Sequence, residues 1–329
     1  MWTHTRMVCE AMAADPSWRA LSELDRRVTW LSALLHDVAK PDCTGTDLDG
    51  RIHARGHSQR GAVMARAILW RMLVPFHERE RICALVARHQ LPFWLLERGD
   101  PLAPALAVSV ATRCDDLAML AEADARGRRC ADQRKLLDNV DLFRTFCDEQ
   151  GCLERPWAFP SDHSRFRYFQ RPGSDPTHHA HESFRCEVVV MSGLPGAGKD
   201  AWIAEHLAGW PVVSLDELRI ELDVDPTDKQ GGVIQAARER AREHLRAGRS
   251  FVWSATNLSR SLRAQTIRLA ADYDARVRVV YVEAPPQTLL RQNAQRPRPV
   301  PEPVIERLLE RWEVPDATEA HEVLHVVGL

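Results

Sequence analysis

Residues 193–200 read Gly-Leu-Pro-Gly-Ala-Gly-Lys-Asp, and this glycine-rich segment constrains the fold more than any other part of the sequence. The apolar run from Val188 to Met191 ends just before it, and a helical pattern begins directly after it at Ala201. A short apolar run, a glycine-rich turn and a helix in direct succession are typical of a strand–loop–helix unit in a parallel sheet. The sequence therefore predicts an α/β domain around this segment.

The same segment has the composition of a loop that binds phosphate. Its glycines let the backbone curl so that N–H groups at the start of the helix face phosphate oxygens, and Lys199 can reach the β- and γ-phosphates. The alternative, a chance glycine-rich turn, is disfavoured because glycine and lysine are both scarce in this chain. We expect a nucleotide to be bound by Gly193, Gly196, Ala197, Gly198, Lys199, Asp200 and Ala201.

Asp200 departs from the usual composition of such a loop, in which a Ser or Thr hydroxyl coordinates Mg²⁺. A carboxylate at this position would repel the phosphates unless a cation lay between them. We therefore expect Asp200 to be a metal ligand and nucleotide binding to depend on Mg²⁺.

Four further short apolar runs alternate with helical patterns after residue 184, at residues 212–215, 251–253, 277–282 and 323–327. This alternation predicts a parallel sheet flanked by helices, and such sheets bind ligands at the carboxyl ends of their strands. Asp216 follows the first of these runs and is a candidate general base, and Arg219, one helical turn later, could hold a substrate phosphate. Ser214 and Glu217 also form a capping box, so Asp216 could simply begin a helix.

More polar residues follow the later runs of this domain. Residues 254–257, with Arg260 and Arg263, could line the groove for the phosphate acceptor. Arg291 and Arg296 could close over the phosphates and neutralise charge in the transition state. A solvated helix face would carry similar arginines, so this pattern is less specific than the loop.

The first half of the chain has a different character. Residues 1–150 show helical periodicity, for example at Leu31, Leu34, Leu35 and Val38, and no convincing alternating strand. We expect an all-helical domain there. Residues 151–183 are rich in proline and contain His178, His179 and His181; a metal site is conceivable, but the composition favours a solvated linker. A third segment, residues 184–329, completes the predicted organisation with the α/β domain.

The helical half also contains histidines and carboxylates in a suggestive order. His36 and Asp37 lie in an apolar segment, where an unpaired charge would be costly and a bound metal would remove the cost. A single histidine is more often structural, but the ordered set favours a site for a divalent ion that activates water to attack phosphorus, with Lys40 gripping the substrate phosphate. The set consists of His4, His36, Asp37, His57, His89 and Asp124, with His53 as a competitor to His57.

Composition limits the other possibilities. A length of 329 residues allows about two domains. The net charge of -2 argues against a protein that holds nucleic acid by bulk charge alone, although a local basic groove is compatible with it. The chain has eight cysteines and no Cys-x-x-Cys pair. We therefore expect a protein of the reducing cytosol, with no disulfide framework and no zinc knot. No signal peptide or apolar run of membrane-spanning length is visible, so we expect a cytoplasmic protein without a membrane partner.

Residues 184–329 resemble the P-loop polynucleotide kinases in the order and spacing of their loop lysine, strand-end aspartate, following arginine and lid arginines. The resemblance implies transfer of the γ-phosphate of ATP or another NTP, with Mg²⁺, to a 5′-hydroxyl nucleic-acid end. It also implies catalytic roles for Lys199, Asp216, Arg219, Arg291 and Arg296.

Residues 1–150 resemble the HD phosphohydrolase superfamily, and the Ala-Asp-x-x-Gly-Arg sequence around Asp124 is similar to that of HD domains attached to tRNA nucleotidyltransferases. The resemblance implies one metal held by His4, His36, Asp37 and Asp124, with His57 and His89 available for a second. The implied ions are divalent transition metals such as Mn²⁺, Ni²⁺ or Co²⁺.

The two halves together resemble the bacterial HD-Pnk enzymes, which heal broken RNA ends. This resemblance implies phosphorylation of 5′-hydroxyl ends of RNA or DNA and removal of 2′,3′-cyclic phosphate, 2′-phosphate or 3′-phosphate ends. The chain lacks a Lys-x-Asp-Gly ligase motif, so an RNA ligase partner would act in trans. Two other classes remain open: a small-molecule or nucleotide kinase fused to an HD nucleotide phosphohydrolase, and a non-catalytic nucleotide sensor.

Overall fold

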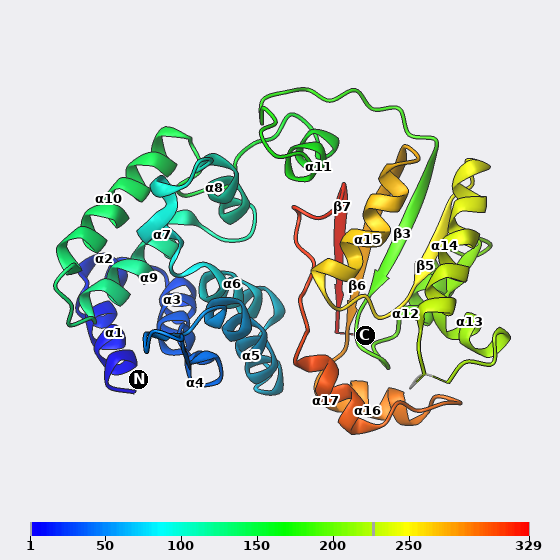
Figure 1. The fold of residues 1–329 in the computed structure, drawn as a ribbon, viewed down its shortest axis with the longest axis horizontal. Coiled ribbons are helices and arrows are strands. Elements are labelled where there is room, and N and C mark those ends of the chain that lie inside the picture. Colours follow the sequence, from blue (N-terminus) through cyan, green and yellow to red (C-terminus); the bar gives the residue numbers. More distant parts are fainter. Residues whose placement is uncertain (1, 226–227, 329) are drawn as a thin grey trace. The chain divides into compact units, whose positions relative to one another are not determined.

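The computed structural model describes residues 2–225 and 228–328. The chain divides into two compact units, Met1–Ala158 and Phe159–Leu329, which differ in architecture (Figure 1). The first is helical, and the second is built around a parallel sheet. The predicted fold class, a helical domain followed by an α/β domain, is therefore confirmed.

The helical unit consists of helices joined by short connections. They are α1 (Trp2–Ala14), α2 (Pro16–Ala20), α3 (Glu23–Leu35), α4 (Lys40–Cys43), α5 (His57–Arg71), α6 (Phe76–Arg88), α7 (Leu91–Trp94), the short η1 (Leu95–Glu97), α8 (Leu102–Ser109), α9 (Cys114–Arg126) and α10 (Gln133–Glu149). The central helix α9 is buried along most of its length and packs against α1, α3, α6 and α10. Its buried faces supply much of the core of this unit.

The helical unit also contains a small β-hairpin, which the prediction of an all-helical domain did not include. Strands β1 (Gly45–Thr46) and β2 (Ile52–His53) pair antiparallel in a small hairpin between α4 and α5. Each strand has only two residues, so no alternation of apolar and polar side chains could reveal it in the sequence.

The second unit contains a five-stranded sheet in the order β4-β5-β3-β6-β7, with every neighbouring pair parallel. The strands are β3 (Cys186–Ser192), β4 (Val212–Ser214), β5 (Phe251–Ser254), β6 (Ala275–Glu283) and β7 (Glu322–Val327). The helices are α11 (Asp162–Gln170), α12 (Lys199–His206), α13 (Leu215–Glu221), α14 (Gly231–Arg246), α15 (Arg260–Ala271), α16 (Pro286–Ala294) and α17 (Glu302–Leu309). Four of the five predicted apolar runs lie within strands of this sheet, and the fifth, 212–215, runs one residue past β4 into α13.

The parallel arrangement explains why these strands could be predicted. Strands in a parallel sheet are covered by helices on both faces, so they read as continuous apolar runs. In β3, Val188, Val189, Val190 and Met191 are all fully buried. Because β3 is central in the sheet, the glycine-rich loop that follows it leaves the carboxyl edge between β5 and β6.

The structure differs from the linker predicted for residues 151–183. Helix α11 lies within that range, begins at a capping Ser161 that accepts the Ser164 N–H, and buries Phe166 in the core of the α/β unit. Arg165 also donates to the carbonyls of Ala317 and His321. A nine-residue helix with few apolar side chains gives little periodicity, which is why the surrounding prolines and histidines obscured it.

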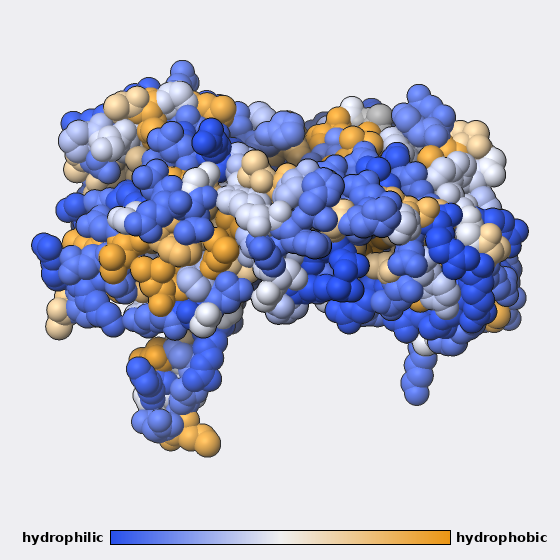
Figure 2. Space-filling view, turned by 90° about the horizontal axis from the view of Figure 1, so that it is seen from above, coloured by the Kyte–Doolittle hydropathy of each residue, from blue (hydrophilic) through white to orange (hydrophobic). Residues whose placement is uncertain are grey.

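The surface contrasts with these cores. Most of the face shown in Figure 2 is hydrophilic, with hydrophobic areas among the polar ones. On the helical unit, Trp94, Leu96 and Leu142 are among the large apolar side chains that are exposed. Within the part of the chain that the structure describes, no helix has both the length and the apolarity needed to cross a bilayer.

Candidate functional site

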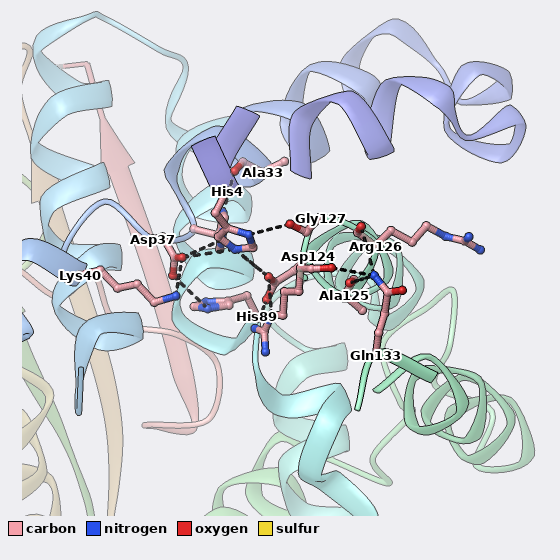
Figure 3. Close-up of polar contacts among 12 residues, drawn as sticks. His4, Ala33, Asp37, Lys40, His89, Asp124, Ala125, Arg126, Gly127 and Gln133 are labelled. Carbon is pink, nitrogen blue, oxygen red and sulfur yellow. Dashed lines mark hydrogen bonds and ion pairs between the residues drawn. The ribbon is translucent and has the colours of Figure 1, made fainter. Parts of the chain in front are cut away.

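Six predicted metal ligands converge in the helical unit, each from the end of a helix. His4 lies in the first turn of α1, His57 begins α5, and Asp124 is in the last turn of α9. His36 and Asp37 follow the last residue of α3, and His89 follows α6. The His-Asp pair thus lies just beyond α3, whereas the helical periodicity of Leu34, Leu35 and Val38 predicted it within a helix. Figure 3 shows His4, Asp37, His89 and Asp124 directed toward one another.

Backbone carbonyl groups orient all four imidazoles. The Nδ1 atoms of His36, His57 and His89 lie 2.7, 2.6 and 2.9 Å from the carbonyl oxygens of the residues three positions earlier. His4 Nδ1 lies 3.1 Å from the carbonyl oxygen of Gly127. Nδ1 must carry the proton to donate to a carbonyl, so in the neutral form of each ring Nε2 has a lone pair directed into the site. This is the arrangement that metal-binding histidines adopt.

The ligand atoms form two adjoining groups that share Asp37. In the first group, Nε2 of His4 lies 3.4 Å from Nε2 of His36 and 3.1 Å from Oδ1 of Asp124, and Nε2 of His36 lies 3.2 Å from Oδ2 of Asp37. In the second group, Nε2 of His57 lies 3.3 Å from Nε2 of His89 and 3.4 Å from Oδ1 of Asp37. The two carboxylate oxygens of Asp37 therefore face different histidine groups.

The charge on Asp37 is only partly compensated by the protein. Lys40 donates to Oδ2 at 2.6 Å, but the buried Oδ1 has no hydrogen-bond partner among the described residues. Burial raises the pKa of Asp37, yet the neighbouring His36 side chain and the Lys40 ammonium outweigh it and hold that pKa well below its usual range. Because an ionised carboxylate with an unsatisfied buried oxygen is costly, the residues fit a cation at this position.

Asp124 is held in place by the chain segment that follows α9. Arg128, four residues later, donates to both carboxylate oxygens, at 3.0 Å from Nε and 2.5 Å from Nη2. Gln133 Nε2 donates to the Ala125 carbonyl (Figure 3). It also donates to the Arg128 carbonyl, and the two bonds fix the end of α9. Despite burial, the contacts of its carboxylate with His4 and Arg128 hold the pKa of Asp124 far below its ordinary value. Asp124 is therefore anionic and rigidly oriented.

Gly127 allows the first ligand to reach the site. A Cβ atom at this residue would lie 2.6 Å from Cγ2 and 2.8 Å from the backbone N of Val8, so only glycine lets α1 approach α9 this closely. The same close approach brings His4 to the Gly127 carbonyl. The glycine in the Ala-Asp-x-x-Gly-Arg sequence is thus required by the packing of two helices.

Other predicted residues lie around this centre. His53 is in β2, where it contacts Asp47 at 3.2 Å, so His57 and not His53 joins the cluster. Lys40 and His4 lie on the walls of two pockets of about 570 and 550 Å³ beside the metal ligands, and Arg128 and Arg129 line the second. The approach to the cluster therefore carries positive charge.

The glycine-rich loop of the α/β unit has the conformation that the sequence predicts. It joins β3 to α12, whose N-cap is Gly198 in the left-handed region with φ of 98°. At Gly193 a Cβ atom would lie 2.3 Å from the Val282 carbonyl oxygen, and at Gly196 one would lie 2.8 Å from the Leu289 carbonyl oxygen. The loop is therefore packed directly against the backbone of β6 and α16. Ala197 is buried within it, and Ala201 is exposed on α12.

Lys199 and Asp200 begin α12. Lys199 Nζ donates to the carbonyls of Gly193 and Leu194 at 2.9 and 3.0 Å, and burial lowers the pKa of Lys199 to about 8. Asp200 is exposed in the first turn, beside the open N-terminus of the helix. Its position is compatible with a metal ligand next to bound phosphate, which is the role that the sequence predicts.

The structure brings Asp216, Arg219 and Arg296 together. Asp216 is in the first turn of α13, and its side chain is 71% exposed. Arg219 forms an ion pair with it and donates to Gln230 at 2.7 Å, and Arg296 Nη2 lies 3.6 Å from Asp216 Oδ2. Ser214 caps the helix by accepting the Glu217 N–H, so capping does not use the Asp216 carboxylate. Arg291 lies exposed on α16.

The residues expected to line an acceptor groove after β5 have structural roles instead. Arg263 is fully buried and donates to both carboxylate oxygens of Glu319 at 2.7 and 2.8 Å. Asn257 is buried and donates to the Met191 carbonyl, and Arg260 contacts Asp316. The prediction was wrong for Arg263 and Asn257, because sequence position at a strand end does not reveal which side chains turn inward.

Sequence reasoning also missed two contributions that the structure makes plain. Arg128 orients Asp124 from the segment just after α9, and the signal was available, since the arginine belongs to the Ala-Asp-x-x-Gly-Arg sequence around Asp124. Asn293 bonds to both the carbonyl and the N–H of Val300, which holds the chain segment that contains Arg296. No sequence pattern predicts the contact between Asn293 and Val300.

Comparisons with known proteins agree with this geometry. Residues 1–120 match the family model of the HD domain, and residues 188–315 match that of an AAA domain. The L-seryl-tRNA(Sec) kinase of Methanococcus maripaludis is 23% identical over 147 residues, which are 40% of this chain and 58% of that protein. The chain thus spans 58% of the length of this curated relative.

Two solved kinase structures are also similar to this chain. A sugar kinase from a Janibacter species is 16% identical, with a TM-score of 0.34, over 43% of this chain and 85% of that one. A gluconokinase from Sinorhizobium meliloti is 20% identical, with a TM-score of 0.33, over 44% and 84%.

The family matches coincide with the two structural units and with the two sites. The six clustered ligands lie in or beside the range of the HD match, and the glycine-rich loop lies in the range of the AAA match. The chain therefore joins an HD domain to a P-loop kinase-like domain.

Proposed function

We propose that this protein heals RNA ends: its P-loop domain phosphorylates 5′-hydroxyl ends, and its HD domain removes 2′,3′-cyclic phosphate, 2′-phosphate or 3′-phosphate ends. The observation that carries the proposal is that one chain holds a metal-hydrolase ligand set and a P-loop kinase site with a strand-end aspartate flanked by two arginines. Strand cleavage of RNA leaves a phosphate on one side and a hydroxyl on the other. A ligase acting in trans needs both ends corrected.

In the HD domain, the four Nε2 lone pairs and the carboxylates of Asp37 and Asp124 would hold one or two divalent ions. Such ions supply Lewis acidity and an activated water for attack on phosphorus. Asp37 presents one oxygen to each histidine group, so its carboxylate would serve as a ligand for an ion held by either group. Ligands of this type suit Mn²⁺, Ni²⁺ or Co²⁺.

The surroundings of this cluster favour a substrate that carries phosphate. Lys40 reaches the edge of the metal site, and its ammonium group can grip a phosphate oxygen when a cation neutralises Asp37. Arg129 adds a second positive charge to the wall of the same pocket. An anionic RNA end would be attracted by this charge even though the chain as a whole has a net charge of -2.

In the kinase domain, the backbone of residues 193–198 cradles the NTP phosphates and Lys199 contacts them. When the γ-phosphate arrives, the Lys199 ammonium can exchange its two loop carbonyls for phosphate oxygens, with which it forms charge-assisted hydrogen bonds. Asp200 provides a ligand for Mg²⁺. Asp216 accepts the proton of the attacking 5′-hydroxyl as that oxygen bonds to the γ-phosphorus and ADP leaves.

The arginines around Asp216 favour a phosphorylated acceptor. Arg219 can bind the phosphate that follows the 5′-terminal nucleoside, and Arg296, with Arg291, can close over the transferred group. The curated relative from Methanococcus is, by its name, a kinase of a seryl group on tRNA, so an acceptor attached to RNA has a precedent among similar proteins.

One assay tests the kinase half against its main alternative, a small-molecule kinase. The protein would be incubated with labelled ATP, Mg²⁺ and either a 5′-hydroxyl RNA oligonucleotide or mononucleosides. We expect label on the oligonucleotide with wild type and at least about 10²-fold slower labelling with Lys199→Ala or Asp216→Ala. Label on mononucleosides alone would overturn the proposal, and binding of ATP without transfer to any acceptor would favour a nucleotide sensor.

A parallel assay tests the hydrolase half. RNA with a 2′,3′-cyclic phosphate end would be offered with Mn²⁺, Ni²⁺ or Co²⁺ to wild type and Asp37→Ala. We expect loss of the cyclic phosphate only with wild type and metal. Equal activity of the two proteins would remove the metal site from the mechanism.

A further inference from the structure

Three cysteines meet in the interior of the helical unit. Cys114 is the first residue of α9, Cys147 lies near the end of α10, and Cys152 follows that helix. All three are fully buried, and their Sγ atoms lie within 4.8 Å of one another. The sequence predicted no zinc knot because these residues do not form a Cys-x-x-Cys pair. The fold nevertheless places them together.

The backbone holds this thiol cluster, Cys114, Cys147 and Cys152, in a fixed geometry. After α10 the chain turns at Gly151, which has a positive φ of 68°, and the Cys152 N–H donates to the Cys147 carbonyl at 2.8 Å. The Asp115 N–H donates to the Leu153 carbonyl at 3.1 Å, which joins this turn to the start of α9. The three thiols are therefore positioned by main-chain contacts and not by chance side-chain packing.

The local electrostatics favour one thiolate at this place, since contacts among the thiols and burial raise the pKa values of Cys114 and Cys147. Cys114 lies at the N-terminus of the 13-residue helix α9, where the helix dipole stabilises a negative charge. Hydrogen bonds from the Cys114 and Cys147 thiols lower the pKa of Cys152. A thiolate in an interior that excludes water needs a positive partner, because an isolated buried charge is costly.

The composition of the cluster restricts the kind of partner. No fourth His, Cys, Asp or Glu among the described residues belongs to this group of ligand atoms. Sulfur ligands select soft ions such as Cu(I) and Zn²⁺, and structural zinc almost always takes four ligands. A site with three sulfurs therefore fits best an ion that accepts three soft ligands.

We propose that Cys114, Cys147 and Cys152 bind one thiophilic metal ion in a buried three-sulfur site. Binding displaces the thiol protons into solvent, including the proton that Cys114 shares with the Ala105 carbonyl. The site is separate from the His-Asp cluster, since Asp124 is ten residues, about 15 Å, further along α9. The ion fastens α10 and its following turn to the start of α9.

Cadmium is a suitable probe, because its bonds to sulfur absorb in the ultraviolet whereas its bonds to imidazole and carboxylate do not. The reduced full-length protein would be titrated with Cd²⁺. We expect the sulfur–cadmium absorption to saturate at one ion per chain, to persist in Asp37→Ala, and to disappear in Cys114→Ser. Cys130→Ser, which alters an exposed cysteine, is the matched control and should retain the absorption.

Competition identifies the natural ion. Zn²⁺ and Cu(I) would each be added to the cadmium-loaded protein; displacement by Cu(I) at lower concentration than by Zn²⁺ is expected for three-sulfur coordination. The reverse order would indicate that a further ligand completes a zinc site, which would overturn the three-sulfur assignment.

Cadmium NMR of the wild type keeps the proposal testable if Cys114→Ser fails to fold. We expect a strongly deshielded resonance from sulfur ligation in addition to any signal from the His-Asp cluster. Absence of sulfur–cadmium absorption and of this resonance would overturn the proposal. So would a disulfide between any two of these cysteines in protein purified without reductant.

Discussion

The two candidate sites of this protein differ in how much of each is built by folding alone. In the HD domain, His36, His89 and Asp124 are fully buried, and every imidazole is oriented by a backbone carbonyl. In the kinase domain, Asp216 is largely exposed, and Lys199 bonds to carbonyls of its own loop. The comparison indicates that the first site is complete before substrate arrives, whereas nucleotide and acceptor must assemble the second.

The difference follows from the chemistry that each site performs. A metal site binds its ion tightly only if the ligands are fixed in advance, and fixing them requires burial and outer hydrogen bonds. A kinase must admit and release two substrates in every cycle, so its charged groups stay accessible and mobile. Substitutions in the two sites should therefore have different consequences.

The largest effect is expected for Asp37→Ala, because Asp37 faces both histidine groups. We expect hydrolysis of cyclic phosphate to fall by at least about 10³-fold, which corresponds to the several kcal/mol that metal ions contribute to such reactions. Phosphoryl transfer should be unchanged. Metal content by mass spectrometry and both rates would be measured together, and retention of bound metal with full hydrolysis would contradict the assignment.

A similar but somewhat smaller effect is expected for Lys199→Ala in the kinase domain. Loss of one preorganised charge at the transferred phosphate should lower the transfer rate by about 10²–10³-fold. Asp216→Asn should lower kcat by about 10²–10³-fold with little change in the KM for ATP, since the base acts on the acceptor. If Asp216→Asn changed only the KM for ATP, the carboxylate would bind nucleotide and not act as the base.

Arg128 and Gly127 test whether the HD site is preformed by its surroundings. Arg128→Gln removes the fork that orients Asp124 and should weaken metal affinity by about 10–100-fold. Gly127→Ala should separate α1 from α9 and withdraw His4, with a loss of similar size. Titration with Mn²⁺ would measure both. Affinities equal to that of wild type would show that the ligands need no such support.

The smallest effect concerns the pH dependence of stability that arises from His321, which packs against α11. His321 is buried between Phe166 and His163, accepts the Val277 N–H, and faces Arg165 and Arg276. Burial and these positive neighbours lower the pKa of His321 to about 3, so the folded state stays neutral while the unfolded chain is protonated. This contribution to stability is complete above the unfolded pKa of about 6.5 and declines as pH falls toward 3.

When the pH falls from 7 to 5.5, protonation of His321 in the unfolded chain should therefore lower the free energy of unfolding of the α/β unit by about 1 kcal/mol. His321→Asn keeps an acceptor for the Val277 N–H but does not titrate, so its thermal unfolding should depend less on pH. An identical pH dependence of wild type and His321→Asn would mean that other groups control the acid sensitivity.

The sequence predicted best the features that depend on local patterns. Continuous apolar runs identified the parallel strands, and the order of histidines and carboxylates identified a ligand set that the fold then brought together. It failed where the outcome depends on distant contacts. The sequence pattern around Arg263 predicts a surface arginine, but its guanidinium is buried and paired with Glu319. Phe166 packs in the core and holds a short helix there, although the surrounding sequence is typical of a linker.

The thiol cluster also could not be predicted from the sequence, because it depends on contacts between distant residues. Cys114 and Cys152 are 38 positions apart, and only the turn after α10 brings their sulfur atoms together. Spacing rules for metal sites detect ligands on one short loop, whereas this cluster combines the start of one helix with the end of the next.

The most direct test of the two-site account is to follow both ends of one cleaved RNA in a single reaction. The substrate would carry a 2′,3′-cyclic phosphate on one fragment and a 5′-hydroxyl on the other, and mass spectrometry would follow both with ATP, Mg²⁺ and Mn²⁺. We predict that wild type corrects both ends, that Asp37→Ala leaves only the cyclic phosphate, and that Lys199→Ala leaves only the 5′-hydroxyl. Failure of wild type to alter either end, or loss of both activities in each variant, would contradict the account.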